Sequence, residues 1–429
     1  MIQTVSYGPR TGQVTIPASK SAAHRLLICA ALSKEPVTLM LDGMSKDIDA
    51  TMKCLSGLGA SFHQKDEQID IEGIVPGNAT ADSVSQYVDL YCGESGSTLR
   101  FLLPLCGALG ASVVFHMEGL LSKRPMDALT GELTAHGMTI RQEDTLLYAS
   151  GQLLPGEYTI PGNISSQYIS GLLFALPLLE GSSKLAVTGK IESESYINMT
   201  ENAIQRAVIR YHRSSQVGDA SLLYEIPGSQ NYRLPSPLNV ERDWSNAAFF
   251  LCMGALSRKG ITLLNMDVHS GQGDMAILKI LEDFGASITI TEDSITVSAN
   301  KLIGHTIDVA DTPDLVPTIC ALAANAQGDT RIIHAERLRF KESDRIVSTA
   351  NMIRALGGIA EETEDGLLIT GKPALTGGTI NPENDHRIAM AAAVAAGACT
   401  GDVIIPGAEC SQKSYPRFWD DLNQLEVLS

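Results

Sequence analysis

Residues 57–73 read GLGASFHQKDEQIDIEG, which predicts a helix end, a glycine, a short strand, an acidic turn and a second strand. The same pattern returns in AHGMTIRQEDTLLYASG (135–151), DFGASITITEDSITVSAN (283–300) and ALGGIAEETEDGLLITG (355–371). The glycines that end the predicted helices are Gly59, Gly137, Gly285 and Gly357. Glycine suits this place because it enters the left-handed backbone region without strain. The four copies recur about every 75 residues with one gap about twice as long, which predicts a diverged copy at 210–228.

Each unit reads as strand, helix, strand, helix and hairpin, and the period fits about six times into the 429 residues. The helices between the strands are apolar or amphipathic, and the Ala-rich helix within 383–398 should be buried all round. We therefore expect an α/β protein of two lobes, each with three units in which sheets wrap a helical core. The alternative is chance similarity among helix–glycine–hairpin fragments.

The composition describes an ordinary globular chain with an acidic balance. Hydrophobic residues make up 44% and charged residues 19%, which excludes disorder and a coiled coil. The formal charge of −17 argues against nucleic acid or an anionic membrane as a partner. The sequence offers no signal peptide or membrane span, so we expect a cytoplasmic protein. Its eight cysteines form no CxxC pair, which predicts buried free thiols rather than disulfides or a metal site.

Basic residues concentrate in the polar loops that precede the helices. Helix N-termini carry partial positive charge and free N–H groups, so they attract anions. The loops are PASKSAAHR (17–25), CGESGSTLR (92–100), LLSKRPMD (120–127), GNISSQY (162–168), DTPDLVP (311–317), RLRFKESDRI (337–346), NDHRIAM (384–390) and CSQKSYPRFW (410–419). Singly, each is explained as well by helix capping or surface ion pairs, and Asp314 by N-capping. Together they predict a cleft between the lobes that binds a strongly anionic small substrate.

In this order and near this spacing, the eight motifs resemble those of the 5-enolpyruvylshikimate-3-phosphate (EPSP) synthase family of enolpyruvyl transferases. The resemblance implies a two-lobed inside-out α/β barrel with three βαβαββ repeats in each lobe. It assigns residues 1–18 and 240–429 to the C-terminal lobe and 19–239 to the N-terminal lobe, with the active site in the cleft. The implied reaction, in the shikimate pathway of aromatic amino acid and chorismate biosynthesis, transfers the enolpyruvyl group of phosphoenolpyruvate to the 5-hydroxyl of shikimate 3-phosphate. Phosphate is released, and no cofactor or metal is implied.

The resemblance also implies roles for individual residues. The implied ligands of shikimate 3-phosphate are Ser21, Arg25, Ser165, Ser166, Gln167, Ser193, Tyr196, Asp314 and Lys341. Those of phosphoenolpyruvate are Lys20, Gly96, Arg124, Gln167, Arg345, Arg387 and Lys413. Both substrates carry a phosphate and a carboxylate, which suits a site rich in Arg and Lys. Addition and elimination through a tetrahedral ketal phosphate require a base and an acid, for which Asp314 and Glu342 are the candidates, and Lys20 could serve with either.

Three positions depart from the family pattern. Glu94 stands where Asn is common, which places an extra carboxylate near the phosphoenolpyruvate pocket, and Ser97 replaces the usual Thr. Arg337 occupies the place of a frequent Asn, so we assign it no substrate contact. Residues 202–235 match the pattern poorly, which leaves the end of the first lobe open.

Two rival functions remain at this point. The sister transferase that acts on UDP-N-acetylglucosamine shares the fold, but its mobile loop usually carries a reactive Cys, which residues 120–127 lack. Its Lys-Asn entry motif is also replaced by Lys20-Ser21. A non-catalytic anion-binding repeat protein is the other rival, and it would not need Asp314, Glu342 and Lys20 together. We expect small-molecule substrates and a monomer.

Overall fold

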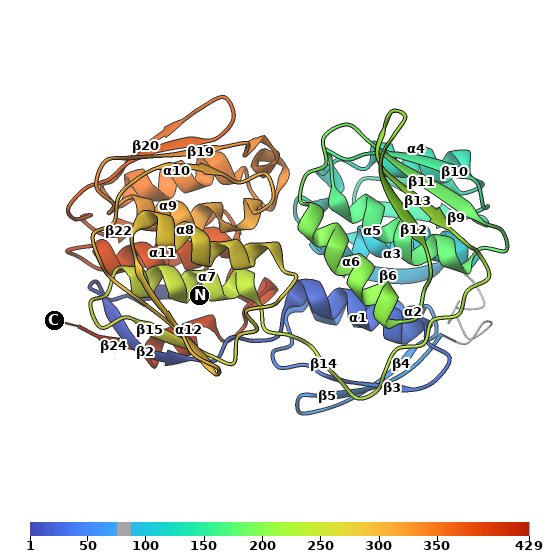
Figure 1. The fold of residues 1–429 in the computed structure, drawn as a ribbon, viewed down its shortest axis with the longest axis horizontal. Helices are drawn as coiled ribbons and strands as arrows, with labels where there is room; N and C mark the ends of the chain where they lie inside the picture. The colour runs from blue at the N-terminus through green and yellow to red at the C-terminus, as the bar shows by residue number, and fades with distance from the viewer. Residues whose placement is uncertain (75–86, 429) are drawn as a thin grey trace. The chain divides into compact units, whose positions relative to one another are not determined.

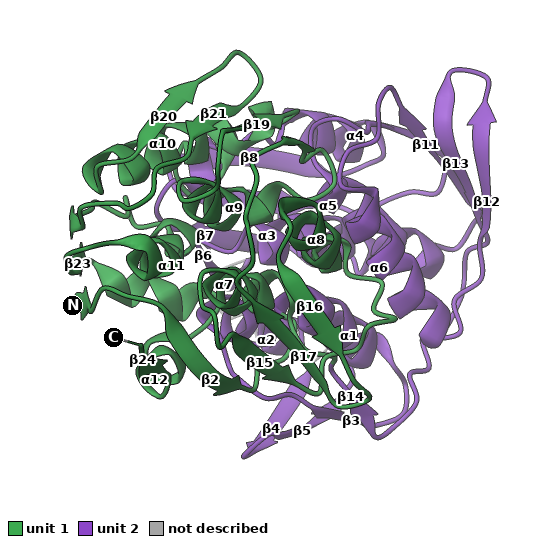
Figure 2. Cartoon of the chain, turned by 60° about the vertical axis from the view of Figure 1, so that its left-hand side comes forward, with its two compact units in different colours: residues 1–19, 241–429 green, residues 20–240 purple. Residues whose placement is uncertain are grey.

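The computed structural model describes residues 1–74 and 87–428 and divides the chain into two compact units (Figure 1, Figure 2). Unit 1 comprises Met1–Ser19 and Glu241–Ser429, and unit 2 comprises Lys20–Val240. The first strands of the chain therefore fold with its C-terminal half. The chain passes from one unit to the other twice, once after Ser19 and once after Val240.

Unit 2 alternates strands with helices along its whole length. Its elements are α1 (Lys20–Leu32), β3 (Val37–Met40), α2 (Lys46–Gly57), β4 (Ser61–Lys65), β5 (Gln68–Glu72), β6 (Val88–Gly93), α3 (Gly96–Ala108), β7 (Val113–Met117), η1 (Leu121–Lys123), α4 (Asp127–Ala135), β8 (Thr139–Glu143), β9 (Leu146–Ser150), β10 (Glu157–Pro161), α5 (Ser166–Ala175), η2 (Leu176–Leu178), β11 (Ser183–Thr188), α6 (Glu194–Arg206), β12 (His212–Val217), β13 (Ala220–Ile226) and β14 (Leu238–Asn239). The elements labelled η are short 3₁₀ helices.

Unit 1 repeats this alternation. Its elements are β1 (Ile2–Val5), β2 (Arg10–Val14), α7 (Trp244–Ala255), β15 (Ile261–Leu264), η3 (Gly273–Ala276), α8 (Ile277–Phe284), β16 (Ser287–Ile290), β17 (Ser294–Ser298), β18 (Thr306–Asp308), η4 (Pro313–Leu315), α9 (Val316–Ala323), β19 (Asp329–Ile333), η5 (Glu336–Phe340), α10 (Arg345–Ala355), β20 (Ile359–Glu362), β21 (Leu367–Thr370), β22 (Gly378–Thr379), α11 (His386–Ala395), η6 (Ala396–Ala398), β23 (Val403–Pro406), η7 (Ala408–Lys413), α12 (Phe418–Asn423) and β24 (Glu426–Val427).

One βαβαββ repeat accounts for the sheets of both units, as the sequence predicted. Three copies are continuous in the chain, and their sheets have the strand orders β6-β7-β9-β8, β10-β11-β13-β12 and β18-β19-β21-β20. In each, the first two strands run parallel across a helix, and a hairpin then adds antiparallel to the second strand. The predicted diverged copy at 210–228 is the hairpin β12–β13 of this series.

The other three repeats are completed by strands from distant parts of the chain. β14, at the end of unit 2, pairs parallel with β3, which opens that unit. β2, at the start of the chain, pairs parallel with β15. β1 pairs antiparallel with β23, where the continuous repeats have a hairpin strand. These long-range pairs close each unit on itself.

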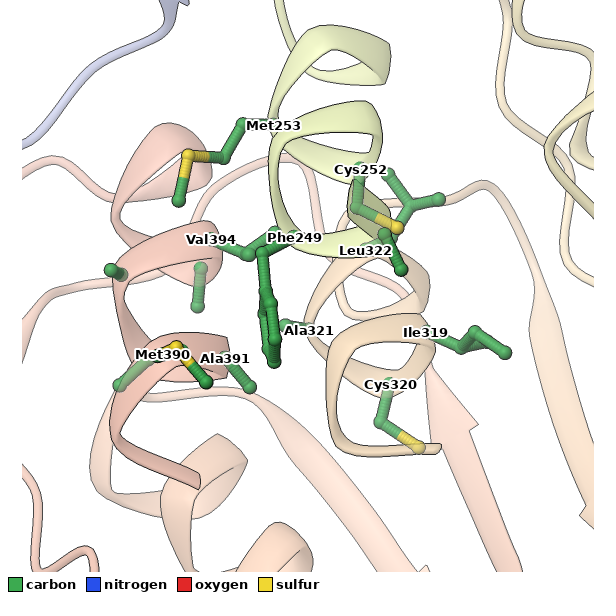
Figure 3. Close-up of a cluster of buried hydrophobic side chains, with 14 of the residues drawn as sticks. Phe249, Cys252, Met253, Ile319, Cys320, Ala321, Leu322, Met390, Ala391 and Val394 are labelled. Atoms are coloured by element: carbon green, nitrogen blue, oxygen red, sulfur yellow. The ribbon is translucent and has the colours of Figure 1, made fainter. Parts of the chain in front are cut away.

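The helices form the core of each unit and the sheets cover it. Strands such as β5 and β6 alternate buried and exposed residues, so one sheet face packs inward and the other faces solvent. In unit 1, helices α7, α9 and α11 pack against one another. Figure 3 shows Phe249, Leu322 and Met390 from these helices within one buried cluster. The Ala-rich helix α11 is buried at all its residues, as predicted. The inside-out α/β fold expected from the sequence is thus confirmed.

A residue at or directly after the C-cap of the second helix in a repeat takes a left-handed conformation. The predicted glycines have φ of 105°, 101°, 94° and 80° at Gly59, Gly137, Gly285 and Gly357. In the diverged copy this place is taken by Val208, with φ of 64°. A β-branched side chain strains this conformation, so the repeat is kept here at a local cost.

Two further findings concern the class of the protein. All eight cysteines are buried and remain as thiols, in agreement with the sequence analysis. Among the described residues, the helices are too short or too polar to cross a membrane.

Candidate active site

Loops of unit 1 bring acidic and basic side chains from distant motifs into one buried cluster. Asp314 lies in η4, Lys341 and Glu342 follow η5, and Arg345 opens α10. Arg387 lies in the first turn of α11 and Lys413 ends η7. Six residues that the resemblance named are therefore together within this unit.

Arg345 is the centre of the cluster, with a side chain only 1% exposed. Its Nε donates to Asp385 Oδ2 at 2.7 Å, its Nη1 to Asp314 Oδ1 at 2.9 Å and its Nη2 to Glu342 Oε2 at 2.6 Å. Three carboxylates from three loops thus surround one guanidinium. Their charges raise the pKa of Arg345 against the opposing effect of burial, so it is a permanent cation.

Asp314 accepts hydrogen bonds from further cations. Lys341 Nζ lies 3.4 Å from its Oδ1, and Arg387 Nη2 donates to its Oδ2 at 2.9 Å. Burial alone would raise the pKa of Asp314, but the charges of Arg387, Lys341 and Arg345 outweigh it and hold the pKa well below its usual value. The side chain makes no helix-capping hydrogen bond. The capping explanation of Asp314 is therefore wrong.

Glu342 is held by two cations. Arg345 donates to its Oε2, and Lys413 Nζ lies 3.3 Å from its Oε1. The implied acid and the implied base of the reaction are thus both bound to residues that the resemblance assigned to phosphoenolpyruvate. Any anion that binds these cations competes with Asp314 and Glu342 for them.

Arg25 is a buried cation of unit 2, and its partners are of a different kind. It is 3% exposed on α1, and its Nε donates to Thr200 Oγ1 at 2.8 Å. Its Nη1 and Nη2 each donate at 2.7 Å, to the backbone carbonyls of Ser21 and Tyr196. Burial lowers the pKa of Arg25 to about 10, so it is charged at neutral pH. Two other implied ligands of shikimate 3-phosphate, Ser21 and Tyr196, thus meet around Arg25, a cation whose partners are neutral oxygens.

A second group in unit 2 surrounds the start of α3. A Cβ added at Gly96 would lie 3.2 Å from Arg124 Nη1, 3.3 Å from Arg100 Nη1 and 3.6 Å from Gln167 Oε1. Arg100 Nη1 donates to Gln167 Oε1 at 2.8 Å, and Gln167 Nε2 donates to Ser97 Oγ at 2.9 Å. Two guanidinium groups therefore converge on a backbone that carries no side chain, an arrangement suited to a phosphate or carboxylate.

The remaining implied residues have local roles as well. Ser165 caps α5 by accepting from the backbone N–H of Gln167 at 3.3 Å, and Ser166 is buried in its first turn. Ser193 precedes α6 with a left-handed φ of 55°, a strained conformation of the kind found at binding sites. Lys20, at the start of α1, pairs with Asp47 Oδ2 at 3.1 Å. Lys20 belongs to unit 2, and Asp314 and Glu342 belong to unit 1. That the three meet in one cleft stays a prediction.

The departures from the family pattern are accommodated locally. Ser97 keeps a hydroxyl that accepts from Gln167. Glu94 packs against Gly119, and Arg337 Nη2 donates to the backbone carbonyl of Ala310 at 2.7 Å. Among the described residues, no group of His, Cys, Asp and Glu is arranged to hold a metal ion.

The sequence analysis missed two residues of these clusters. Asp385 is fully buried, accepts from Arg345 and caps α11 through the N–H of Arg387 at 2.9 Å. It stands directly before the His-Arg pair of the quoted motif, so its place as an N-cap could have been predicted. Arg100 ends another quoted motif, four residues after Gly96, and helical spacing brings it back to the helix start.

Comparison with known proteins identifies the family. The family model described as EPSP synthase (3-phosphoshikimate 1-carboxyvinyltransferase) matches residues 6–422. The chain is 40% identical over 416 residues to a 3-phosphoshikimate 1-carboxyvinyltransferase of Clostridium kluyveri, covering 96% of this chain and 95% of that one. The chain belongs to the EPSP synthase family. The resemblance drawn from the motifs is confirmed, and the chain is an enzyme of this family.

Other members agree with this assignment. The Brachyspira hyodysenteriae protein of the same name is 37% identical over 434 residues, covering 99% of both chains. A crystal structure of EPSP synthase from Acinetobacter baumannii matches with a TM-score of 0.79 and 25% identity over 100% of both chains. The enolpyruvyl transferase NikO from Streptomyces tendae, 16% identical, matches with a TM-score of 0.76 over 100% of this chain and 97% of its own. The NikO likeness shows a shared fold.

Proposed function

We propose that this protein is a 3-phosphoshikimate 1-carboxyvinyltransferase, which transfers the enolpyruvyl group of phosphoenolpyruvate to the 5-hydroxyl of shikimate 3-phosphate and releases phosphate. The observation that carries the proposal is the family match over residues 6–422. The chemistry of the two clusters supports it, because each substrate bears a phosphate and a carboxylate that need several cations. Arg25 would bind shikimate 3-phosphate, and Arg124, Arg345, Arg387 and Lys413 would bind phosphoenolpyruvate.

The contacts of unit 1 suggest how substrate binding activates the two proposed catalytic carboxylates. Asp314 is a poor base while Arg387, Lys341 and Arg345 hold its pKa far below the usual value. Anionic groups of the substrates would attract those cations and weaken their hold on Asp314. The pKa of Asp314 would then rise toward the range in which it accepts the hydroxyl proton.

The same competition applies to the proposed acid. Glu342 is bound by Arg345 and Lys413. A carboxylate or phosphate that takes these cations would let Glu342 carry the proton that carbon 3 must receive. Lys20 could exchange a proton with either carboxylate. Asp314 and Glu342 would therefore reach the protonation states that catalysis needs only when substrate is bound.

The test is phosphate release from phosphoenolpyruvate, with shikimate 3-phosphate and UDP-N-acetylglucosamine compared as acceptors. We expect release with shikimate 3-phosphate alone. Release with the UDP-sugar alone would favour the sister transferase, and release with neither would favour the non-catalytic alternative.

A variant separates the proposed base from a structural role. In Asp314→Asn, turnover should fall by about a hundredfold or more, because the amide cannot accept the proton. Shikimate 3-phosphate should still bind, because Arg25 and the serines remain. Near-normal turnover would remove Asp314 from the mechanism.

We also propose that the enzyme acts as a cytoplasmic monomer. Its eight thiols fit a reducing compartment, and each proposed ligand comes from the one chain. The mass in solution, measured by light scattering with and without substrates, tests the monomer.

A further inference from the structure

Arg213, on the outer hairpin of the third repeat of unit 2, binds three side chains of α6 at once. It lies on β12 and its side chain is 25% exposed. Its Nη1 donates to Asn198 Oδ1 at 3.0 Å and to Glu201 Oε2 at 3.1 Å, and its Nη2 donates to Glu194 Oε1. The helical spacing of these three partners places them on one face of α6. A single guanidinium from the hairpin therefore reaches along α6 to its first residue.

The partner of Arg213 that lies deepest is also held by the second strand of the hairpin. Tyr224 stands directly opposite Arg213 in the register of β12 and β13. The hydroxyl of Tyr224, a buried residue, donates to Glu201 Oε1 at 2.6 Å. A buried carboxylate needs such donors, so packing of α6 on the hairpin explains the contact with Glu201. It does not explain the contacts with Glu194 and Asn198, which lie nearer the start of the helix.

The opposite face of α6 belongs to the proposed binding site for shikimate 3-phosphate. On this face the backbone carbonyl of Tyr196 and the Oγ1 of Thr200 accept hydrogen bonds from Arg25. Two guanidinium groups thus hold α6 from opposite faces, and α1 and α5 pack against it. Because a helix moves as a rigid element, a shift on the side of Arg213 also displaces the groups on the side of Arg25.

The start of α6 is strained and is not held by a side-chain cap. Ser193 precedes the helix with φ of 55° and ψ of 44°, and its side chain makes no capping hydrogen bond. A left-handed conformation is unfavourable for serine, so it persists only where its surroundings enforce it. Glu194 is the next residue, and its ion pair with Arg213 fixes the chain directly after the strained turn.

We propose that Arg213 is a positioning residue for shikimate 3-phosphate, which fixes the left-handed turn at Ser193 and with it the first turn of α6 that carries Tyr196. The inference rests on the proposed function, because Ser193 and Tyr196 are implied ligands of that substrate. Arg213 need not touch the substrate itself. A site whose ligands are ordered before binding has a higher affinity, because binding no longer has to order them.

The experiment compares wild type with Arg213→Met, which keeps an unbranched side chain and removes its charge and its donors. Calorimetric titration should show the affinity for shikimate 3-phosphate falling about tenfold, as it does when only about a tenth of the molecules hold the binding arrangement. Bound shikimate 3-phosphate restores that arrangement. The kcat and the KM for phosphoenolpyruvate, measured at saturating shikimate 3-phosphate, should therefore stay within about twofold of wild type.

Two further variants separate positioning from a general structural role. Arg206→Met makes the same chemical change at an exposed residue in the last turn of α6 and should match wild type. Ser193→Gly removes the implied ligand hydroxyl and adopts the left-handed conformation without strain. Arg213→Met should therefore weaken binding less in the Ser193→Gly background than in wild type, because both changes act on the same turn.

Several outcomes would overturn the proposal. Unchanged affinity in Arg213→Met, or a joint loss of kcat and of both affinities, means that Arg213 only stabilises the hairpin. Losses that multiply in the double variant mean that Arg213 does not act through the turn at Ser193. If wild type does not bind shikimate 3-phosphate, the proposed function fails and the inference fails with it.

Should Arg213→Met not fold, a milder variant decides the question. Glu194→Ala removes only the ion pair at the helix start and leaves Arg213 bound to Asn198 and Glu201. It should weaken the binding of shikimate 3-phosphate at least about threefold while kcat stays near that of wild type. An affinity equal to that of wild type in Glu194→Ala would contradict the proposal.

Discussion

The two units share one repeat but hold their buried cations in opposite ways. In unit 2, Arg25 donates only to neutral oxygens, those of Thr200, Ser21 and Tyr196. In unit 1, Arg345 is surrounded by three carboxylates. A buried charge without an opposite charge costs several kcal/mol, whereas a paired one is largely compensated. We infer that unit 2 offers a ready anion site, whereas unit 1 must exchange ion pairs to bind an anion.

We propose that this difference divides the work of the enzyme between binding and catalysis. An anion at Arg25 gains the full attraction of an uncompensated charge. An anion at Arg345 or Arg387 must displace Asp314 and Glu342, the two residues proposed to move protons. In this proposal an anion binds more weakly in unit 1, but its binding changes the ion pairs of the two proposed catalytic carboxylates. Both arrangements occur on the same repeat. Each repeat places a loop at the N-terminus of a helix, and these loops carry different residues.

The largest expected effect comes from removing each cation in turn. Arg25→Gln should lower the affinity for shikimate 3-phosphate by about a hundredfold, because a buried charged contact of this kind is worth about 2–5 kcal/mol. The stability of the Arg25→Gln variant should change little, since the substitution also removes a buried charge that has no opposite charge beside it. Calorimetric titration and denaturant unfolding measure the two quantities.

The matched variant in unit 1 should behave in the reverse way. Arg345→Gln leaves Asp314, Glu342 and Asp385 facing one another without their shared cation. Breaking a buried pair by removing one partner costs about 3–5 kcal/mol, so unfolding should require clearly less denaturant. Equal stability losses in Arg25→Gln and Arg345→Gln would show that the two units do not differ as described.

A smaller effect is expected at Gly96, which lies among the residues of unit 2 proposed to bind phosphoenolpyruvate. Gly96→Ala would place a methyl group 3.2 Å from Arg124 Nη1 and 3.3 Å from Arg100 Nη1, which crowds the space proposed for substrate oxygens. We expect the KM for phosphoenolpyruvate to rise about tenfold, with shikimate 3-phosphate binding nearly unchanged. Gly131→Ala, on α4 with no atom within 4 Å of an added Cβ, is the control. An unchanged KM in Gly96→Ala would place the pocket elsewhere.

Much of the fold could be predicted from the sequence because its repeat has a local signature. A glycine at a helix end followed by two short strands and an acidic turn is visible without any tertiary information. The pairing of β14 with β3, and of β2 with β15, has no such signature, since it joins segments about two hundred residues or more apart. Only the family resemblance placed the first strand with the C-terminal half.

The candidate site was predictable to a similar degree. Motif residues such as Arg345, Arg387 and Lys413 were found because basic groups at helix starts stand out in an acidic chain. The carboxylates that neutralise these basic residues could not be predicted, because ion pairs between loops depend on the fold. Asp314 could be a cap or a partner of cations on sequence grounds, and its contacts decide against the cap.

The smallest expected effect concerns a place where one repeat of unit 2 departs from the other copies, which include Gly59 and Gly137 of the same unit. Unit 1 ends the second helix of its repeats with Gly285 or Gly357, whereas unit 2 has Val208 at this place in the diverged copy. Val208 is 62% exposed, so its side chain contributes little packing. A left-handed conformation costs an ordinary residue about 1–2 kcal/mol, and glycine gives back about 0.5–1 kcal/mol through the greater entropy of the unfolded chain.

Val208→Gly should therefore stabilise the protein by up to about 1 kcal/mol, measured as a higher midpoint of denaturant unfolding with an unchanged slope. Val217→Gly makes the same chemical change at another half-exposed position of unit 2, at the end of strand β12. There it removes a side chain suited to a strand and should lower stability by about 0.5–1 kcal/mol. Opposite signs for the two variants would attribute the effect at Val208 to its backbone conformation. A loss of stability in both would mean that Val208 is held by packing, and that the diverged repeat ends its helix by other means than the strained left-handed turn.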